Sequence, residues 1–179
     1  MRLHIDTLEN AEFGNIAFAV SEKGLRYLSF GRYAGLVDIL EYACCKGFTI
    51  DENYPVTDDI KKQLIEYFAG TRREFDIKLD IDDNPPFLKK VLLETAKIPY
   101  GQVLTYGQLA EKVGSPRSVR AIGQAMAKNP IPIVIPCHRV IGSKGELTGY
   151  SAGDGINLKR RLLELEGVIT QGMKAVLSS

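Results

Sequence analysis

Hydrophobic and polar residues follow a strand-like pattern in the first third of the chain. The runs "IAFAV" (16–20) and "LRYLSF" (25–30) are short and β-rich, and "SEKG" between them supplies turn residues. This pattern predicts a β-hairpin. A later run, "EFDIKLDI" (74–81), alternates hydrophobic and polar positions and predicts an edge strand.

Two further segments of this part of the chain are predicted to be helices. The stretch "GLVDILEYACCKG" (35–47) is amphipathic and ends at Gly47, which suits a C-cap. In "TDDIKKQLIEYFAG" (57–70), Thr57 can serve as the N-cap, two aspartates fall in the first turn, and Gly70 follows the end. Strands and helices are therefore expected to mix in the N-terminal part of the chain.

The stretch "DIDDNPP" (80–86) resembles a linker more than any other part of the chain, because it combines turn residues with two prolines. We place a domain boundary near residue 83, which predicts one domain over residues 1–83 and a second over residues 84–179. The chain contains no internal repeat and no low-complexity tract.

Helical patterns dominate the second domain. Asn84 can cap a helix with Pro85 at its first position, and this helix is predicted to stop at Pro99. Two short helices follow in residues 105–130, the first capped by Thr105, and "GSP" separates them. Their apolar stripes consist of Leu109, Ala110 and Val113 in the first helix and of Val119, Ile122 and Met126 in the second. Two short helices around a tight turn predict a helix-turn-helix, although such a turn also joins ordinary packed helices.

The second of these helices is unusually rich in small residues, namely Ser118, Ala121, Gly123, Ala125 and Ala127. A helix that reads base edges in the major groove needs long polar side chains, and this one offers chiefly Arg120 and Gln124. Small residues allow a close approach to a narrow minor groove, where Arg120 could enter the base stack and replace an extruded nucleotide. A tightly packed core helix would also explain the alanines but not the lone arginine.

Composition and charge narrow the expected partners. Hydrophobic residues make up 45% of the 179 residues and charged residues 25%, as in an ordinary globular protein. No apolar run is long enough to span a bilayer, and "MRLHIDTLEN" lacks the apolar core of a signal peptide. These features predict a cytoplasmic protein, or a nuclear one in a eukaryote, with no membrane partner.

The formal net charge of +1 conceals a strong asymmetry between the two predicted domains. Residues 1–83 carry 10 basic and 16 acidic residues, a net charge of −6, whereas residues 84–179 carry 13 and 6, a net charge of +7. A basic half indicates a polyanion such as nucleic acid. Mutual attraction between the two halves explains the same numbers equally well.

The cysteines and histidines do not predict a metal site. The chain has three cysteines and two histidines, with no CxxC motif and no paired spacing for zinc. We expect no metal and no cofactor. Cys44 and Cys45 fall in the first predicted helix, where we expect them to contribute to packing.

The stretch "NPIPIVIPCHRVIG" (129–142) surrounds Cys137 with prolines and aliphatic residues and places His138 and Arg139 directly after it. An apolar, buried cysteine is ordinarily inert, whereas positive neighbours favour the reactive thiolate. On a strand, Cys137 and His138 would point to opposite faces unless the backbone bends. The prolines predict a stiff, non-helical approach to the cysteine, which suits either a preorganised nucleophile or a plain buried loop.

Several motifs together resemble the O6-alkylguanine-DNA alkyltransferase (methylated-DNA–protein-cysteine methyltransferase) family. They are "IPCHRVIG" (135–142), "IPYGQVLTYGQLA" (98–110), "SVRAIGQAMAKNP" (118–130), "LTGYSAG" (147–153) and "LKRRLLELEG" (158–167). The resemblance is strong over residues 85–168 and weaker before them. It implies an α+β protein with an N-terminal mixed sheet-and-helix domain (RNase H-like) and a mostly helical C-terminal domain with a winged-helix-like helix-turn-helix.

The resemblance also implies an activity. A protein of this family binds duplex DNA through the minor groove, flips out the damaged guanine, and transfers its O6-alkyl group irreversibly to a cysteine, once per molecule. O4-alkylthymine is a second substrate implied in the same way. The resemblance further implies a monomer without a cofactor.

The resemblance assigns roles to individual residues. The catalytic residues would be Cys137 as nucleophile, His138 as base through a water, Glu166 to orient His138, and Tyr106 as proton donor to the departing guanine. The DNA-binding residues would be Thr105, Ser118, Arg120, Ala121, Gly123 and Gln124. The base pocket would consist of Tyr106, Met126, Pro132, Val140, Tyr150 and Ser151, and Asn129 would tie the hinge after the recognition helix to the active-site turn.

Two other functions compete with this one. Alkyltransferase-like proteins bind such lesions without removing the alkyl group, and they lack the cysteine that this chain has at position 137. A lesion sensor with an incidental Cys137 is therefore the principal alternative. A cysteine hydrolase is the other, but the chain lacks the glycine-rich nucleophile setting that many hydrolases use.

Overall fold

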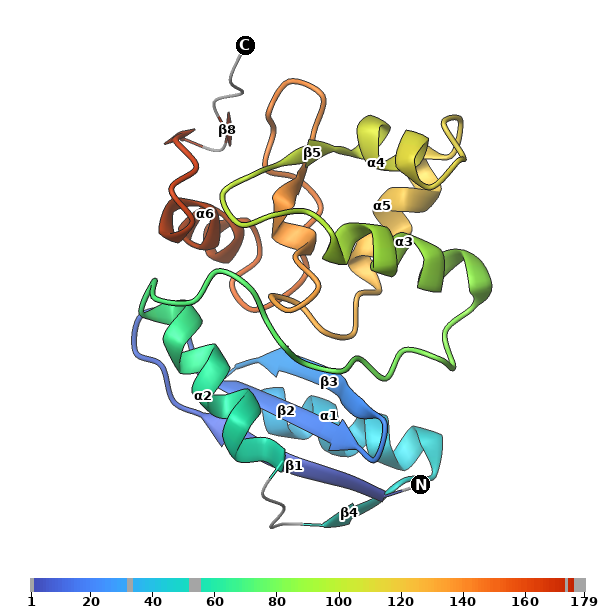
Figure 1. Ribbon diagram of the computed structural model, residues 1–179, viewed down its shortest axis with the longest axis vertical. Coiled ribbons are helices and arrows are strands. Elements are labelled where there is room, and N and C mark those ends of the chain that lie inside the picture. Colours follow the sequence, from blue (N-terminus) through green and yellow to red (C-terminus); the bar gives the residue numbers. More distant parts are fainter. Residues whose placement is uncertain (1, 32–33, 52–55, 173, 176–179) are drawn as a thin grey trace. The chain divides into compact units, whose positions relative to one another are not determined.

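The computed structural model describes residues 2–31, 34–51, 56–172 and 174–175. Within it the chain forms two compact units, Met1–Ile81 and Asp82–Ser179 (Figure 1). Residue 83, where the sequence predicted the boundary, belongs to the second unit, and the predicted ranges 1–83 and 84–179 also extend over residues outside the described ones. Each unit is treated separately below.

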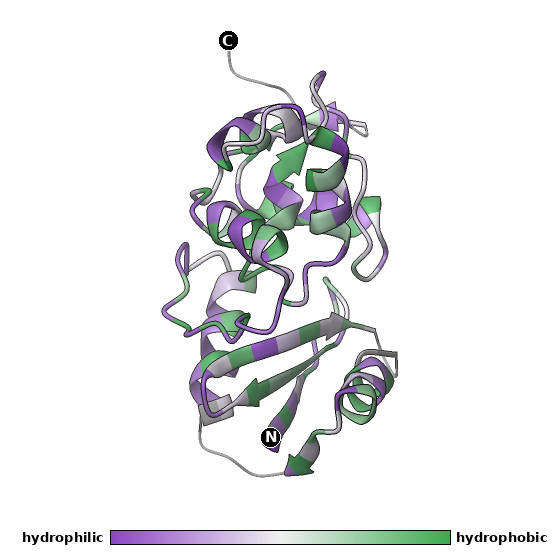
Figure 2. Cartoon of the chain, turned by 90° about the vertical axis from the view of Figure 1, so that its right-hand side faces the viewer, coloured by the Kyte–Doolittle hydropathy of each residue, from purple (hydrophilic) through white to green (hydrophobic). Residues whose placement is uncertain are grey.

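The first unit is built on a four-stranded sheet. Its strands are β1 (Arg2–Leu8), β2 (Ile16–Ser21), β3 (Gly24–Phe30) and β4 (Thr49–Asp51), in the order β3-β2-β1-β4. The β1–β2 and β2–β3 pairs are antiparallel, and β1–β4 is parallel. Hydrophobic and hydrophilic residues both occur along the strands of this sheet (Figure 2), whereas every residue of the interior strand β2 is buried. The sheet is thus covered on both faces.

Two helices provide this cover, α1 (Ala34–Lys46) and α2 (Val56–Phe68). Ile39 and Ala43 of α1 pack against Ala17 and Ala19 of β2, and α2 lies over the opposite face (Figure 1). Alternate residues of a strand point to opposite faces, so a helix on each side explains the burial of all of β2. The predicted hairpin and both predicted helices are confirmed.

Three details of the first unit differ from the prediction. Thr57 lies inside α2 and is buried, so it is not the N-cap. Cys44 and Cys45 are exposed and do not pack in the core. Residues 74–81 form no strand but a single bridge between Leu79 and Leu25. The physical reason is that an α2 side chain takes a hydrogen bond that a ladder would need: Asp76 donates its backbone N–H to Gln63 Oε1 (2.9 Å).

The second unit contains four α-helices among its described residues, which are α3 (Pro86–Ala96), α4 (Tyr106–Lys112), α5 (Val119–Ala127) and α6 (Ile156–Leu165). Short elements connect them: the parallel pair β5 (Leu104–Thr105) and β6 (Val140–Ile141), the 3₁₀ turn η1 (Cys137–Arg139), and the antiparallel pair β7 (Thr170–Gln171) and β8 (Lys174–Ala175). Helices α3, α4 and α5 pack against one another, and α6 contacts η1.

The helix-turn-helix lies in α4 and α5. Thr105 caps α4 in a capping box with Gln108, as the sequence predicted for the N-cap. Leu109, Ala110 and Val113 are buried as predicted. Val119 is not, because it lies in the exposed first turn of α5 while the rest of the predicted stripe faces α3 and α4.

The start of the second unit also differs in detail. Helix α3 begins at Pro86 with Pro85 in the N-cap position, so the helix starts one residue later than predicted and Asn84 is not its cap. Pro85 has an extended backbone (φ −52°, ψ 144°), which is the conformation that the residue before a proline prefers. No helix in the described ranges has the length and apolar run that a bilayer crossing requires.

Candidate active site

Cys137 lies at the start of a tight turn and not on a strand. Residues 131–141 are buried throughout, and η1 begins directly after Pro136. The backbone therefore bends here, which is the case that the sequence left open, and a 3₁₀ turn changes the direction of successive side chains by about 120°. Ile133 adopts a left-handed conformation (φ 75°), a strained state for a β-branched residue that the surrounding buried segment must hold in place.

Asn129 connects the end of α5 to this turn. Its side-chain amide donates to the Cys137 sulfur (3.0 Å) and to the Ile135 carbonyl (2.8 Å), while its Oδ1 accepts from the Ile131 N–H (3.1 Å). One side chain thus fixes the segment before the cysteine and also contacts the reactive atom. A donor on the sulfur favours the thiolate over the thiol.

His138 and Glu166 form a fully buried pair. Nε2 of His138 lies 2.8 Å from Oε1 of Glu166, which is the C-cap residue of α6. A carboxylate only accepts hydrogen bonds, so Nε2 carries a proton and, in a neutral ring, Nδ1 carries the lone pair. Burial lowers the pKa of His138, and this effect outweighs the attraction of Glu166. The resting imidazole is therefore neutral and can act as a base at Nδ1.

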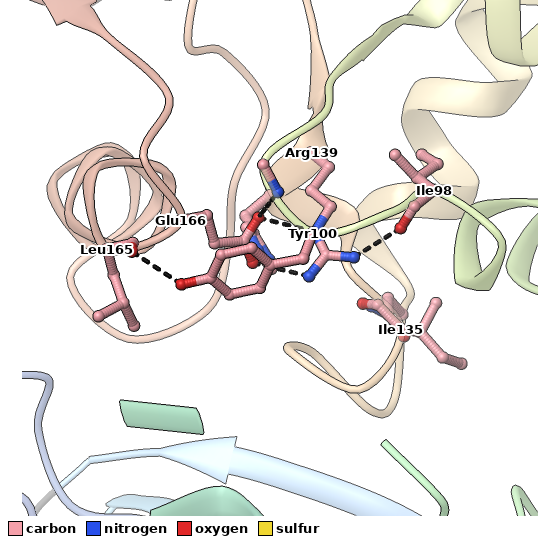
Figure 3. A network of polar contacts seen from close by, with 9 residues as sticks. Ile98, Tyr100, Ile135, Arg139, Leu165 and Glu166 are labelled. Carbon is pink, nitrogen blue, oxygen red and sulfur yellow. Dashed lines mark hydrogen bonds and ion pairs between the residues drawn. The ribbon is translucent and has the colours of Figure 1, made fainter. Parts of the chain in front are cut away.

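Arg139 contacts the same carboxylate (Figure 3). Its Nε donates to Oε2 of Glu166 (2.8 Å) and one of its terminal nitrogens donates to Oε1 (2.7 Å), while the other donates to the Ile98 carbonyl. Burial alone would raise the pKa of Glu166, but the hydrogen bonds from His138 and Arg139 hold it well below its usual range. Glu166 is therefore an anion at neutral pH.

The cation near the thiol is Lys159 of α6. Its side chain is fully buried, and Nζ donates to the carbonyls of Val140 and Thr148 (2.5 and 3.0 Å). Burial raises the pKa of the Cys137 thiol, while Asn129 and the charge of Lys159 oppose this increase. The lysine is itself affected, because burial lowers its pKa to about 8. The sequence suggested that positive neighbours activate the cysteine, but the guanidinium of Arg139 contacts Glu166 and the Ile98 carbonyl instead.

Tyr106 shares an acceptor with this lysine. Its hydroxyl donates to the Thr148 carbonyl (3.0 Å), and Nζ of Lys159 lies 6.0 Å from the centre of its ring. Gly149 has a left-handed conformation (φ 70°), and a Cβ there would lie 2.8 Å from the Tyr106 hydroxyl oxygen. Only glycine fits this position. Burial raises the pKa of Tyr106, so its hydroxyl is a proton donor at neutral pH.

The other predicted pocket residues differ in burial and in hydrogen bonding. Tyr150 is buried, and its hydroxyl has no hydrogen-bond partner among the described residues. Burial, followed by the nearby Cys137 and Glu166, raises the pKa of Tyr150 well above its ordinary value. Ser151 is exposed, with Oγ 3.4 Å from the Ala127 carbonyl. Met126 and Pro132 are buried, and the Met126 sulfur lies 3.6 Å from the Thr95 hydroxyl.

The predicted DNA-binding residues lie on α5 or at its N-terminus, except Thr105, which caps α4. Arg120, Gly123 and Gln124 recur at helical spacing together with Ala127. Arg120 and Gln124 are exposed, and a Cβ added at Gly123 would meet nothing within 4 Å. Ser118 and Ala121 are half-buried. The Thr105 hydroxyl accepts from the Gln108 N–H (3.1 Å) as part of the helix cap.

Three contributors to the site were missed by sequence reasoning. Lys159 could have been noticed, because it interrupts the buried stripe formed by Leu158, Leu162 and Leu163. Arg139 was named only as a positive neighbour of the cysteine. The Thr148 carbonyl left no signal at all, since a backbone acceptor is independent of residue type. Among the described residues, no group of three or more potential ligands is arranged to hold a metal.

The fold and the site together define a two-unit α+β protein with a helix-turn-helix and a buried cysteine that accepts a hydrogen bond from Asn129 and is followed directly by a histidine paired with Glu166. Residues 86–168 match the family described as "6-O-methylguanine DNA methyltransferase, DNA binding domain", and residues 5–81 match its "ribonuclease-like domain". The chain belongs to the 6-O-methylguanine DNA methyltransferase family. The predicted fold class and family are confirmed.

Relatives support this assignment over nearly the whole chain. A methylated-DNA–protein-cysteine methyltransferase from Methanosarcina acetivorans is 39% identical over 154 residues, which cover 86% of this chain and 92% of the relative. One from Mycobacterium tuberculosis is 51% identical over 104 residues, 58% of this chain and 61% of the relative. A crystal structure of the Mycobacterium tuberculosis protein in complex with DNA has a TM-score of 0.75 and 37% identity, covering 91% of this chain and 92% of that one.

Proposed function

We propose that this protein repairs DNA directly by moving an alkyl group from O6 of a guanine to the sulfur of Cys137, once per molecule. The observation that carries the proposal is the arrangement around that sulfur: a donor from Asn129 at 3.0 Å, and beside the cysteine a neutral His138 whose Nε2 lies 2.8 Å from Glu166. This arrangement is that of a nucleophile with a base and a group that orients the base.

The transfer would proceed in two linked steps. His138 takes the thiol proton at Nδ1, through a water, and becomes an imidazolium that Glu166 stabilises. The sulfur then bonds to the alkyl carbon, the bond from that carbon to O6 breaks, and guanine leaves with the electron pair. A proton donated by Tyr106 would neutralise the departing base. The product is a thioether, whose bond from sulfur to the alkyl carbon is not broken by water, and this explains why the protein would work only once.

The apolar setting of Cys137 suits a flat, neutral base. Val140, Tyr150 and Ser151 would surround the flipped guanine, with Met126 and Pro132 behind them. The unpartnered Tyr150 hydroxyl supports a ligand at this position, because a buried hydroxyl is normally paired. O4-alkylthymine offers the same kind of alkyl–oxygen bond and is a second candidate substrate.

The DNA would be a duplex bound through its minor groove. Helix α5 presents small residues and open space at Gly123, which would let its backbone approach a narrow groove, and Arg120 would fill the gap left by the flipped base. Ser118, Ala121, Gln124 and Thr105 would lie along the same contact. One copy of the protein suffices for this chemistry, so we infer a monomer, located with genomic DNA in the cytoplasm or, in a eukaryote, the nucleus.

The proposal is tested by mixing equimolar protein with a duplex that carries one O6-methylguanine, followed by intact and peptide mass measurement. We expect a gain of one methyl group on the peptide that contains Cys137, saturating at one per molecule, and no gain in Cys137→Ala. Binding of the duplex by wild-type protein without modification would favour a lesion sensor. Repeated turnover on an ester or peptide would favour a hydrolase.

A further inference from the structure

Several contacts fix the orientation of the Arg139 guanidinium. Its guanidinium makes a two-point contact with Glu166 and a third hydrogen bond to the Ile98 carbonyl, and it lies 5.8 Å from the centre of the Tyr100 ring (Figure 3). The Tyr100 hydroxyl donates to the carbonyl of Leu165, the residue before Glu166 (2.8 Å). The fork of the arginine therefore has one orientation, directed at the carboxylate.

The Glu166 carboxylate is consequently shared. Oε1 accepts from both His138 and Arg139, and Oε2 accepts from Arg139 and from the Gly101 N–H (3.3 Å). In a hydrolase triad the carboxylate mainly orients and stabilises the histidine. Here a permanent cation already neutralises it, so a proton added to His138 would leave a net positive charge in a buried site.

The other ionisable groups that face His138 and Glu166 either oppose protonation of His138 or are uncharged at neutral pH. Lys159 of α6 adds positive charge on the thiol side, and it opposes protonation of His138 as Arg139 does. Cys137 and Tyr150 remain protonated at neutral pH because burial raises the pKa of each. Tyr100 contributes its ring and a hydroxyl that is engaged with Leu165. Arg139 is the member of this set that contacts the histidine's own partner.

We propose that Arg139 is a positioning residue that acts through Glu166 to keep His138 neutral, with its proton on Nε2 and its lone pair on Nδ1, ready to accept the thiol proton. The inference rests on the proposed function, because it assigns Arg139 a part in activating Cys137. Loss of the arginine would make the histidine hold a proton more tightly. The cysteine–histidine pair would then be inactive over a wider acidic range.

Direct observation of the imidazole tests this without measuring alkyl transfer. The chain has only two histidines, so His4→Gln identifies the signals of each ring in nitrogen NMR. We expect His138 to be neutral and protonated on Nε2 at pH 7 in the wild type. In Arg139→Gln, its titration midpoint should rise by about one pH unit or more, as the loss of a nearby like charge predicts. A doubly protonated ring in the wild type, or an unchanged midpoint in a folded Arg139→Gln, would overturn the proposal.

The pH dependence of single-turnover transfer provides the second readout. The acidic limb of the Arg139→Gln profile should move upward with the NMR midpoint, and its rate should recover at alkaline pH. Arg139→Lys keeps the charge but not the fork, so its limb should stay in place while its rate falls roughly tenfold at all pH values. If Arg139 only supported the fold, Arg139→Gln and Arg139→Lys would both lower the rate of alkyl transfer by a factor independent of pH.

Removing Arg139 leaves Glu166 buried and unpaired, so Arg139→Gln is at risk of unfolding. The double variant Arg139→Gln/Glu166→Gln avoids this, because no charged partner is left behind. Compared with Glu166→Gln alone, it should show nearly the same His138 midpoint, because Arg139 acts through the carboxylate that both variants lack. A rise of about one pH unit or more would show that Arg139 acts on the histidine directly and would contradict the proposal. If the ring behaves as expected but Cys137 gains no alkyl group, the proposed function fails and not the assignment of the ring's protonation state.

Discussion

At the scale of single residues, the site depends on which polar group contacts which. Cys137 alone is a buried thiol whose pKa is raised by burial, and it would be a poor nucleophile. Asn129 donates to the sulfur, His138 supplies a base, and Glu166 fixes the ring. In the proposed function, these three groups together oppose the effect of burial and make the thiol a nucleophile.

Replacing His138 should separate binding from chemistry. We expect His138→Gln to slow methyl transfer by about 100-fold or more, because the thiol then loses its general base, and to leave the affinity for the lesion duplex unchanged. The measurements are single-turnover quench kinetics and fluorescence anisotropy on the same duplex. His4→Gln, in β1 of the first unit, is the matched control and should react at the wild-type rate. An unaltered rate in His138→Gln would remove this residue from the mechanism.

At the scale of elements, local sequence signals determine helix α4, whereas packing determines which side of α5 is accessible. The capping box at Thr105 and the buried stripe of α4 follow directly from the sequence. In α5 the buried side is set by Ile122 and Met126, which leaves Arg120 and the open position at Gly123 on the accessible side. The accessible side of α5 thus carries small residues and one long positively charged side chain, Arg120, as expected for a helix that approaches DNA closely.

Arg120→Ala should impair repair only where a base must be flipped. We expect a loss of about tenfold or more in the rate on duplex O6-methylguanine, corresponding to at least ~1.4 kcal/mol, and a wild-type rate on free O6-benzylguanine. Both rates follow from peptide mass at timed intervals. Lys97→Ala removes an exposed positive charge from the C-cap of α3 and controls for the change in net charge. Equal losses on the duplex and the free base would contradict a role in flipping.

At the scale of the whole molecule, the buried ionised groups of the second unit link its stability to pH. The folded state holds His138 neutral and Glu166 ionised, with both pKa values lowered from their ordinary 6.5 and 4.5. The unfolded chain therefore binds protons that the folded chain does not. By linkage, stability is greatest above about pH 6.5 and is lost progressively as the pH falls below it.

Acid should accordingly destabilise the second unit before strong acid is reached. We expect its free energy of unfolding to fall by on the order of 2 kcal/mol between pH 7.5 and pH 4. Hydrogen exchange of amides in α3 and α6, followed at several pH values, reports this quantity for the second unit alone. Glu166→Gln should be less stable at pH 7.5 but should depend less steeply on pH. The same steepness in both proteins would show that other carboxyl groups are responsible.

The sequence by itself determined most of the elements and the nature of the site. Caps, apolar spacing and prolines are local signals, so the hairpin, α1, α2, α4 and α5 could be predicted, and the motif around Cys137 indicated the chemistry and the family. Local signals failed where a distant group supplied the partner: within residues 74–81, the Asp76 N–H donates to the side chain of Gln63 and not to a neighbouring strand.

Only the tertiary structure decided how the charges of the site are distributed. The contact of Arg139 with Glu166 spans 27 residues of chain, and that of Lys159 with the Val140 carbonyl spans 19. Neither separation leaves a periodic trace in the sequence, because such contacts depend on how helix α6 packs against the turn at Cys137. Folding alone placed the guanidinium of Arg139 on the Glu166 carboxylate and the ammonium of Lys159 on the carbonyls of Val140 and Thr148.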